Sequence, residues 1–231
     1  MNVAIIPARG GSKRLPGKNI REFCGQPIIK YSIDAAIESG VFDRVIVTTD
    51  LQEIADVAKA CGAEIPFLRP AELSDDHTPT IPVIRHAVET LQQSGDAVEC
   101  ACCIYATAPF VQSDDLKQGL KQLQSGVGEF AFPVTTFPFP IMRSLKIDDD
   151  QIEMIWPEHE MTRSQDLVEA WHDAGQFYWG TSEAWKTAGG LYSANCVPIR
   201  IPRWRVQDID TEEDWNRAQL MHRALCGKPN P

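Results

Sequence analysis

A short apolar run near the N-terminus leads into a glycine turn crowded with cations. Residues 2–7 are long enough for one buried strand, and Gly10 and Gly11 follow almost at once. Adjacent glycines let the backbone turn tightly and bring its N–H groups close to a ligand. The chain carries a net charge of −10, yet four cations fall between residues 9 and 18. This pattern predicts a polyphosphate-binding loop, and a solvated basic loop after an edge strand is the alternative.

The loop matches neither of the common glycine-rich motifs. A P-loop needs a lysine that opens a helix, whereas Pro16 and Gly17 break any helix here. A dinucleotide fingerprint needs G-x-G-x-x-G, a spacing that Gly10, Gly11 and Gly17 do not have. Both nucleotide-binding classes are therefore excluded.

Composition sets the broad class. A chain of 231 residues, 43% hydrophobic and 23% charged, predicts one domain over 1–231. The acidic balance argues against nucleic acid, and no apolar run approaches the roughly 20 residues of a membrane span. The start lacks signal-peptide character, which predicts a cytoplasmic protein. Cys100 and Cys103 lie in an apolar run without a second cysteine pair, so we expect core residues rather than a zinc site.

Helix and strand patterns alternate along the chain. This order predicts an α/β fold with a mainly parallel, Rossmann-like sheet covered on both faces. Asp50, with Glu53 three residues on, and Ser113 are the expected N-caps of two helices. The expected strands are 2–7, 44–49, 98–105, 130–134, 175–179 and 197–201. The expected helices are 27–39, one between Asp50 and Gly62, 80–93, one after Ser113, 181–188 and one from 211.

The alternation breaks off at residue 136. Residues 136–172 begin with an aromatic, proline-rich stretch and contain two short segments joined by three aspartates, which predicts a hairpin. We expect 136–172 to form an inserted arm.

The stretch from Ile6 to Asn19 closely resembles the signature loop of sugar nucleotidyltransferases. More narrowly, it is similar to the CMP-sialic acid synthetase family, which activates nine-carbon 2-keto sugar acids with CTP. The resemblance implies a nucleotide-diphospho-sugar transferase fold, CTP and a nonulosonic acid as partners, and a homodimer formed through the arm. It also implies catalytic roles for Arg9, Lys13 and Lys18, and nucleotide contacts by Ala8, Arg9, Gly10, Gly11, Ser12, Lys13, Asn19, Arg69, Thr78 and Thr80.

A candidate metal site lies near the C-terminus. Asp208 and Asp210 alternate, so an extended backbone would point both carboxylates to one face. Mg²⁺ prefers such oxygen ligands and takes the rest from phosphate and water. Spacing alone leaves open that Asp210 only caps the helix from 211. The family resemblance implies the metal role.

The acceptor sugar has a carboxylate, and arginine binds carboxylates bidentately. Arg143 and Arg163 are the candidates in the arm, and Tyr105 ends a strand at the edge where ligands bind. Relatives that use sialic acid tend to carry Gln at this tyrosine. Segment 163–179 resembles the pseudaminic acid cytidylyltransferases, which implies pseudaminic acid as acceptor for cell-surface or flagellar glycans. The predicted sugar contacts are Tyr105, Arg143, Arg163, His172, Gln176 and Tyr178.

Three alternatives remain open at this point. A neighbouring enzyme would activate sialic acid, legionaminic acid or the eight-carbon acid of lipopolysaccharide. A nucleotide-sensing module would keep the fold but lack the metal pair or the cations. A glycosyltransferase would carry its Asp-x-Asp mid-chain, where this chain has none.

Overall fold

The computed structural model describes residues 1–193 and 195–225. Its centre is a seven-stranded sheet with the order β11-β6-β10-β5-β1-β4, and β9 pairs with β6 beside this path. Strands β1, β4 and β5 are mutually parallel, as are β6 and β11, whereas β10 runs antiparallel to both of its neighbours. The strands span Asn2–Pro7 (β1), Arg44–Thr48 (β4), Cys100–Ile104 (β5), Phe130–Thr136 (β6), Trp171–Asp173 (β9), Phe177–Thr181 (β10) and Cys196–Arg200 (β11).

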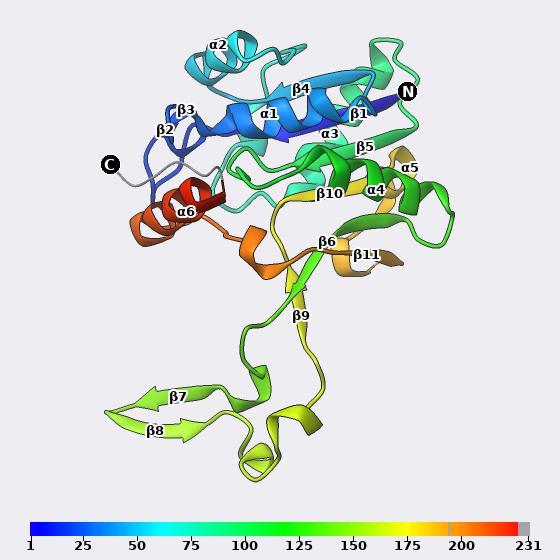
Figure 1. Cartoon of the computed structure of the whole chain (residues 1–231). Coiled ribbons are helices and arrows are strands. Elements are labelled where there is room, and N and C mark those ends of the chain that lie inside the picture. The colour runs from blue at the N-terminus through cyan, green and yellow to red at the C-terminus, as the bar shows by residue number, and fades with distance from the viewer. Residues whose placement is uncertain (194, 226–231) are drawn as a thin grey trace.

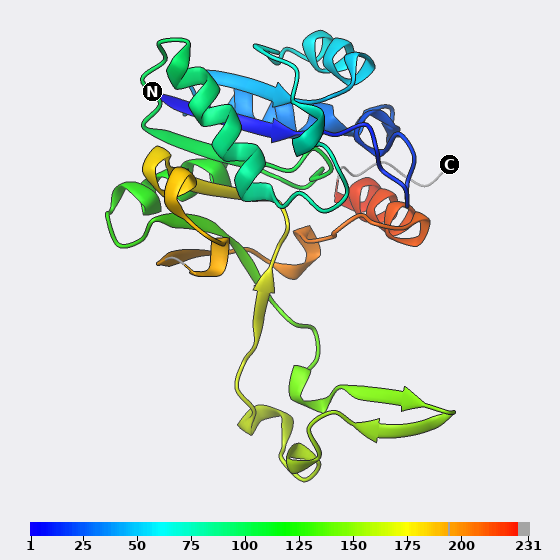
Figure 2. The same ribbon diagram turned by 180° about the vertical axis from the view of Figure 1, so that it is seen from behind.

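Helices cover both faces of this sheet (Figures 1 and 2). Alternate residues of β1 enter different core clusters: Ala4 and Ile6 pack with α1, α2 and α4, whereas Val3 and Ile5 pack with α3 and α5. This alternation is the period of a strand buried on both sides. The predicted α/β fold is confirmed. The helices span Ile28–Ser39 (α1), Gln52–Ala60 (α2), Thr80–Gln93 (α3), Ser113–Gln124 (α4), Ser182–Thr187 (α5) and Glu212–Leu225 (α6).

A third core cluster lies apart from the sheet and beneath the N-terminal loop. It brings Leu15 of that loop together with Ile209 and with Trp215 of α6, all at most 2% exposed. The short antiparallel hairpin of β2 (Glu22–Phe23) and β3 (Gln26–Pro27) supplies Phe23, whose ring packs edge-on against Trp215. The cluster therefore joins two ends of the chain that are far apart in sequence.

Between β6 and β9 the chain leaves the body and projects away from it (Figure 1). The predicted hairpin is confirmed: β7 (Leu145–Asp148) pairs antiparallel with β8 (Gln151–Met154). Asp149 and Asp150 form its turn with φ of 43° and 61°, as expected for a two-residue type I′ turn. Within the described residues, no helix is long and apolar enough to cross a membrane.

Two predicted caps are wrong. The helix after β5 begins at Ser113 itself, with Gln112 as N-cap and no side-chain cap bond. Helix α2 begins at Gln52 with Leu51 as N-cap, so Asp50 lies one residue too early to cap it. The core prediction is confirmed for Cys103, which is fully buried, whereas Cys100 at the start of β5 is half-buried; burial raises the pKa of both thiols.

Candidate active site

Four chain segments converge at one edge of the sheet. The loops after β1, β4 and β5 leave from the carboxyl ends of parallel strands, where open α/β sheets bind ligands. Because β10 is antiparallel and Phe177 pairs with Ile104, the residues before Phe177 reach the same edge. The sheet topology thus brings residues 8–19, 49–50, 105–107 and 171–176 together.

The first of two large cavities at this edge has a volume of about 570 Å³ and is mainly polar. We call it the nucleotide cavity. Most of the predicted nucleotide contacts line it, whereas Ala8 is buried behind it and Gly10 and Gly11 do not line it. Its lining includes Arg9, Ser12, Lys13, Arg14, Lys18, Asn19, Arg69, Asp76, Thr78, Thr80, Tyr105, Asp208 and Asp210.

Two hydrogen bonds hold the glycine loop in place. The Gly10 N–H donates to Asp50 Oδ1 at 2.9 Å, and Asn19 Nδ2 donates to the Arg9 carbonyl at 2.9 Å. Asp50 is therefore a loop anchor rather than a helix cap. A side chain at Gly10 would put its Cβ 3.1 Å from Leu51, so this position favours glycine on packing grounds.

The cations of this loop are already paired with carboxylates. Arg9 and Lys13 both form ion pairs with Asp76. Hydrogen bonds from Lys13 and then Arg9 lower the pKa of Asp76 to about 2. Asp76 therefore remains ionised at neutral pH. A phosphate that binds to Arg9 and Lys13 would have to replace Asp76 as their partner.

Arg69 presents buried donors to the same cavity. Its side chain is only 3% exposed, and its Nη2 lies 3.9 Å from Asp50 Oδ1. Nε and Nη2 have no hydrogen-bond partner among the described residues. Burial lowers the pKa of Arg69, while the charge of Asp50 opposes this effect. Because an unsatisfied buried donor is costly, these groups favour an incoming acceptor such as a nucleotide oxygen.

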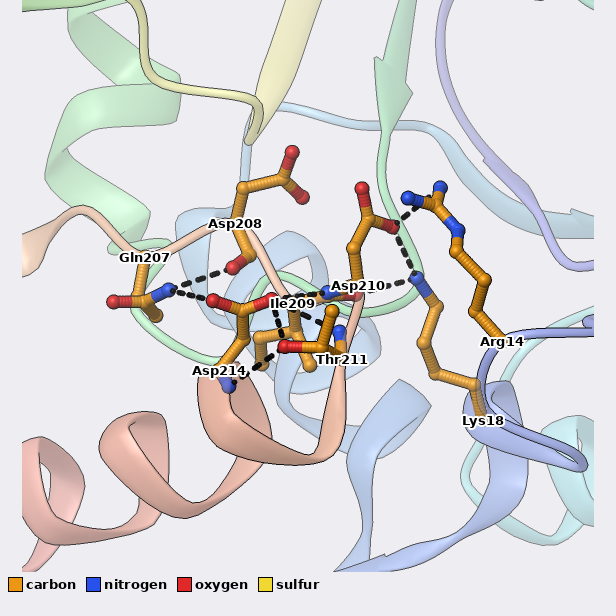
Figure 3. A network of polar contacts seen from close by, with 8 residues as sticks. All are labelled: Arg14, Lys18, Gln207, Asp208, Ile209, Asp210, Thr211 and Asp214. Atoms are coloured by element: carbon orange, nitrogen blue, oxygen red, sulfur yellow. Dashed lines mark hydrogen bonds and ion pairs between the residues drawn. The ribbon is translucent and has the colours of Figure 1, made fainter. Parts of the chain in front are cut away.

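The Asp-x-Asp segment faces this cavity, as Figure 3 shows. Ile209 is fully buried in the third core cluster, which turns the side chains of Asp208 and Asp210 outward together. Asp210 Oδ1 lies 3.0 Å from Arg14 Nη2 and 3.3 Å from Lys18 Nζ, and Lys18 also donates to the Ile209 carbonyl at 2.6 Å. Burial, and next the charge of Asp210, raise the pKa of Asp208.

The capping alternative for Asp210 is wrong. Helix α6 is capped by Thr211, whose Oγ1 accepts from the Asp214 N–H at 3.2 Å, while Asp214 Oδ2 accepts from the Thr211 N–H at 2.9 Å. This is a reciprocal capping box with Asp in place of Glu. The Asp210 carboxylate therefore does not cap α6, and it lines the nucleotide cavity.

The residues present fit a Mg²⁺ ion that is held partly by the protein and partly by the phosphates of a bound substrate. Among the described residues no group of three or more His, Cys, Asp or Glu side chains forms a protein-only metal site. Mg²⁺ commonly binds through one or two carboxylates and takes its other ligands from phosphate and water. Asp208 and Asp210 supply such a pair beside the cationic loop.

The second large cavity, which we call the sugar cavity, has a volume of about 950 Å³. Tyr105 and Asp208 line both cavities, so the two meet at these residues. Predicted sugar contacts His172 and Tyr178 line it as well. Its lining also includes Thr135, Thr136, Pro138, Asp173, Ala174, Gly175, Arg203, Trp204, Val206, Gln207, Arg217, Met221, Ala224 and Leu225.

Three predicted sugar contacts lie elsewhere in this chain. Gln176 is 3% exposed and donates through Nε2 to the Arg205 carbonyl at 2.6 Å. Arg143 and Arg163 sit on the projecting segment, where Arg143 donates to the Glu160 carbonyl and Arg163 pairs with Asp166. A sugar contact by any of the three stays a prediction.

Sequence reasoning missed several residues of the site. Arg203, Trp204 and Arg217 join the sugar cavity. Asp76 joins the nucleotide cavity without a predicted role of its own, although it lies two residues before the predicted nucleotide contact Thr78. Arg14, one of the four predicted loop cations, lines the same cavity. The residues from 203 onward follow the last strand, and their local sequence gives no sign of a cavity.

Comparison with known proteins agrees with this geometry. The cytidylyltransferase family model matches residues 3–183, and the chain belongs to this family. It is 42% identical over 224 residues to a pseudaminic acid cytidylyltransferase of Campylobacter jejuni, covering 96% of this chain and 97% of that protein. It is 30% identical to a CMP-N,N'-diacetyllegionaminic acid synthase of Legionella pneumophila, covering 85% and 79%.

The fold has close structural parallels. A solved CMP:2-keto-3-deoxy-manno-octonic acid synthetase, complexed with CTP, superposes with a TM-score of 0.72 at 15% identity and covers 97% of this chain and 99% of that one. At this identity the likeness speaks for the fold alone.

Proposed function

We propose that the chain is a pseudaminic acid cytidylyltransferase. It transfers the CMP group of CTP to the sugar acid and releases pyrophosphate. The observation that carries this proposal is the junction of two unlike cavities: a cationic one and a larger one with hydroxyl and aromatic walls, meeting at Tyr105 and Asp208. The 42% identity to a named pseudaminic acid cytidylyltransferase supports the choice of sugar.

The junction suits an attack by a sugar hydroxyl on the α-phosphorus. Such a transfer asks the protein mainly for positioning and charge neutralisation. In the proposed complex, Arg9 and Lys13 leave Asp76 to bind the triphosphate, and Lys18 contacts the reacting phosphate. Asn19, Arg69, Thr78 and Thr80 contact the nucleotide. Asp208 and Asp210 would hold Mg²⁺, which neutralises phosphate charge when bound.

On the other side, His172 and Tyr178 contact the sugar. The His172 ring packs against Phe137 with centroids 4.7 Å apart, so its position is fixed by the aromatic stretch at the base of the projecting segment. Because the reaction consumes CTP, we expect the enzyme to act in the cytoplasm.

The direct test is product identification. The purified chain is incubated with CTP, Mg²⁺ and pseudaminic, legionaminic or sialic acid, and each mixture is analysed by mass spectrometry. We expect the CMP-sugar of pseudaminic acid to form fastest. Formation of the legionaminic product at the higher rate would favour the second candidate, which the 30% identity to the Legionella synthase supports. No CMP-sugar from any of the three would refute the proposal.

We further propose that the projecting segment mediates a homodimer. The hairpin β7–β8 exposes Leu145 (56%), Ile147 (73%) and Ile152 (67%), an apolar surface unusual for a free hairpin. In a symmetric dimer, Arg143 and Arg163 would reach the partner's sugar cavity.

Sedimentation tests the dimer. The wild type should sediment as a dimer, and Ile147→Asp with Ile152→Asp should release monomers. The matched control, Lys146→Asp, changes a charged residue on the same strand and should leave the dimer intact. A fully active wild-type monomer would contradict this part of the proposal.

A further inference from the structure

One carboxylate beside the sugar cavity gathers three hydrogen bonds. Asp173 Oδ1 accepts from the Gly175 N–H at 2.8 Å. Its Oδ2 accepts from the hydroxyl of Tyr178 at 2.6 Å and from that of Tyr192 at 2.7 Å. Asp173 lines the sugar cavity and also a smaller neighbouring cavity of about 430 Å³, on whose wall Tyr192 lies. The carboxylate is therefore within reach of a ligand from two sides.

An ionised carboxylate only accepts hydrogen bonds, and this fixes the direction of both tyrosine contacts. Tyr178 and Tyr192 must each donate to Asp173. Behind Tyr178, the Tyr105 ring packs against it with centroids 5.3 Å apart, and the Tyr105 hydroxyl lies 3.1 Å from Thr80 Oγ1. Burial raises the pKa of Tyr105 to about 12, so it stays protonated. The two donating tyrosines thus meet an anion that offers only acceptor positions.

The two tyrosines on Asp173 differ in how firmly they are held. Tyr178 belongs to β10 and is 2% exposed, so its hydroxyl is a fixed part of the interior. Tyr192 is 71% exposed and lies in the single-turn 3-10 helix Leu191–Ser193, which follows Gly189 and Gly190. The Tyr178 hydroxyl is therefore a fixed donor, whereas a ligand can replace the Tyr192 hydroxyl without disturbing the packed interior.

We propose that Asp173 determines specificity for the acceptor sugar by accepting a hydrogen bond from one of its N–H or O–H groups, which takes the place of the Tyr192 hydroxyl. This inference rests on the proposed function and deepens it. Asp173 is half-buried, and a bound sugar would cover it further. An acceptor covered without a donor is costly, so the site selects sugars with a donor at this position and rejects analogues that can only accept. Pseudaminic acid carries amide donors at its 5 and 7 positions.

Asp173→Asn separates this role from a structural one. The amide oxygen of Asn can still accept from Gly175, so the turn before β10 is kept while the anion is lost. The matched control is Asp114→Asn on α4, an exposed carboxylate whose one ion pair within the described residues is with Lys117 and which lines neither cavity. Tyr192→Phe removes the replaceable donor and leaves the carboxylate.

The experiment measures pseudaminic acid binding by calorimetry and, separately, KM for the sugar, KM for CTP and kcat. For Asp173→Asn we expect the Kd and KM of the sugar to rise at least tenfold, with KM for CTP within twofold of wild type and the Asp114→Asn control unchanged. For Tyr192→Phe we expect sugar affinity equal to wild type or up to a few-fold tighter.

Either of two results overturns the inference. One is sugar affinity within twofold of wild type in Asp173→Asn, and the other is a tenfold loss of sugar affinity in Tyr192→Phe, which would make Tyr192 itself the ligand. Both leave the proposed function standing if the wild type forms the CMP-sugar. Conversely, sugar binding that depends on Asp173 without CMP-sugar formation would refute the proposed function and keep the inference. To distinguish an amide from a hydroxyl donor, the same variants are titrated with sialic acid, which has a hydroxyl at position 7.

Discussion

The two cavities that meet at Tyr105 and Asp208 are built on different principles. The nucleotide cavity relies on charge: Arg9, Lys13 and Lys18 face the carboxylates of Asp76 and Asp210. The sugar side relies on direction, because the hydroxyls of Tyr178 and Tyr192 both donate to Asp173. Charge attracts any polyphosphate, whereas hydrogen bonds of fixed direction discriminate between similar sugars. We therefore expect the nucleotide cavity to supply affinity for the triphosphate and the sugar cavity to supply selectivity between sugars.

The largest expected effect concerns Asp208, one of the two residues that line both cavities. Asp208→Asn keeps the shape of the side chain but removes a metal-ligand charge. We expect kcat/KM to fall on the order of 100-fold or more at saturating Mg²⁺. Steady-state pyrophosphate release measures it, with Asp114→Asn as the exposed control. Activity within twofold of wild type would remove Asp208 from the metal site.

Next comes the charge of the nucleotide cavity itself. Lys13→Ala should lose a charge-assisted phosphate contact of about 1.5–3 kcal/mol and raise KM for CTP roughly 10- to 100-fold. KM for the sugar should stay within a few-fold. Lys117→Ala, an exposed lysine on α4, is the control. An unchanged KM for CTP would show that the loop does not bind the triphosphate.

A smaller effect separates stability from chemistry at neighbouring residues. Thr211→Ala removes the cap of α6 and should lower the free energy of unfolding by about 1 kcal/mol. Its kcat/KM should stay within about twofold of wild type. Asp210→Asn should show the reverse pattern, since its carboxylate has no capping bond. Urea denaturation measures the stability of both variants, and pyrophosphate release measures their activity. Equal losses of stability in Thr211→Ala and Asp210→Asn would contradict the assignment of the cap to Thr211.

The smallest effect is a pH dependence. The folded pKa of Asp76 is about 2, below its ordinary value of 3.8, because Lys13 and then Arg9 bind the carboxylate. A lowered folded pKa adds stability that is present above the unfolded pKa and lost as pH falls through the folded one. Asp76→Asn should therefore be less stable than wild type at neutral pH, and the gap should narrow below about pH 4. Urea midpoints across this range measure it, and a gap that widens on acidification would contradict the ion pairs.

The two cavities also differ in how far the sequence predicted them. The cations of 9–18 and the pair Asp208 and Asp210 are clustered in sequence, so local spacing was enough to single out both segments. The metal role of the aspartates, however, rested on the family resemblance. What spacing could not show is that Leu15 and Ile209 enter one core cluster and hold both segments face to face. That contact joins residues nearly two hundred positions apart, and only the fold creates it.

Errors arose where two local rules compete. Asp50 followed by Glu53 fits a capping box, but α2 begins one residue later and Asp50 binds the Gly10 N–H instead. On the sugar side, the Gln176 amide donates to the Arg205 carbonyl, a contact that its sequence neighbourhood does not reveal, and its sugar contact stays a prediction. Arg203 and Trp204 lie in the 3-10 turn Arg203–Arg205 after β11, and Arg217 lies on α6. They were missed because their contact with the cavity depends on how these elements pack, which no local pattern encodes.

The most direct test of this division is a single kinetic table: KM for CTP and KM for pseudaminic acid in the wild type, Lys13→Ala and Asp173→Asn. We predict that Lys13→Ala raises only KM for CTP by tenfold or more, and that Asp173→Asn raises only KM for the sugar by a similar factor. If each variant instead raised both constants to the same extent, the two cavities would not be separate recognition sites, and the account would be contradicted.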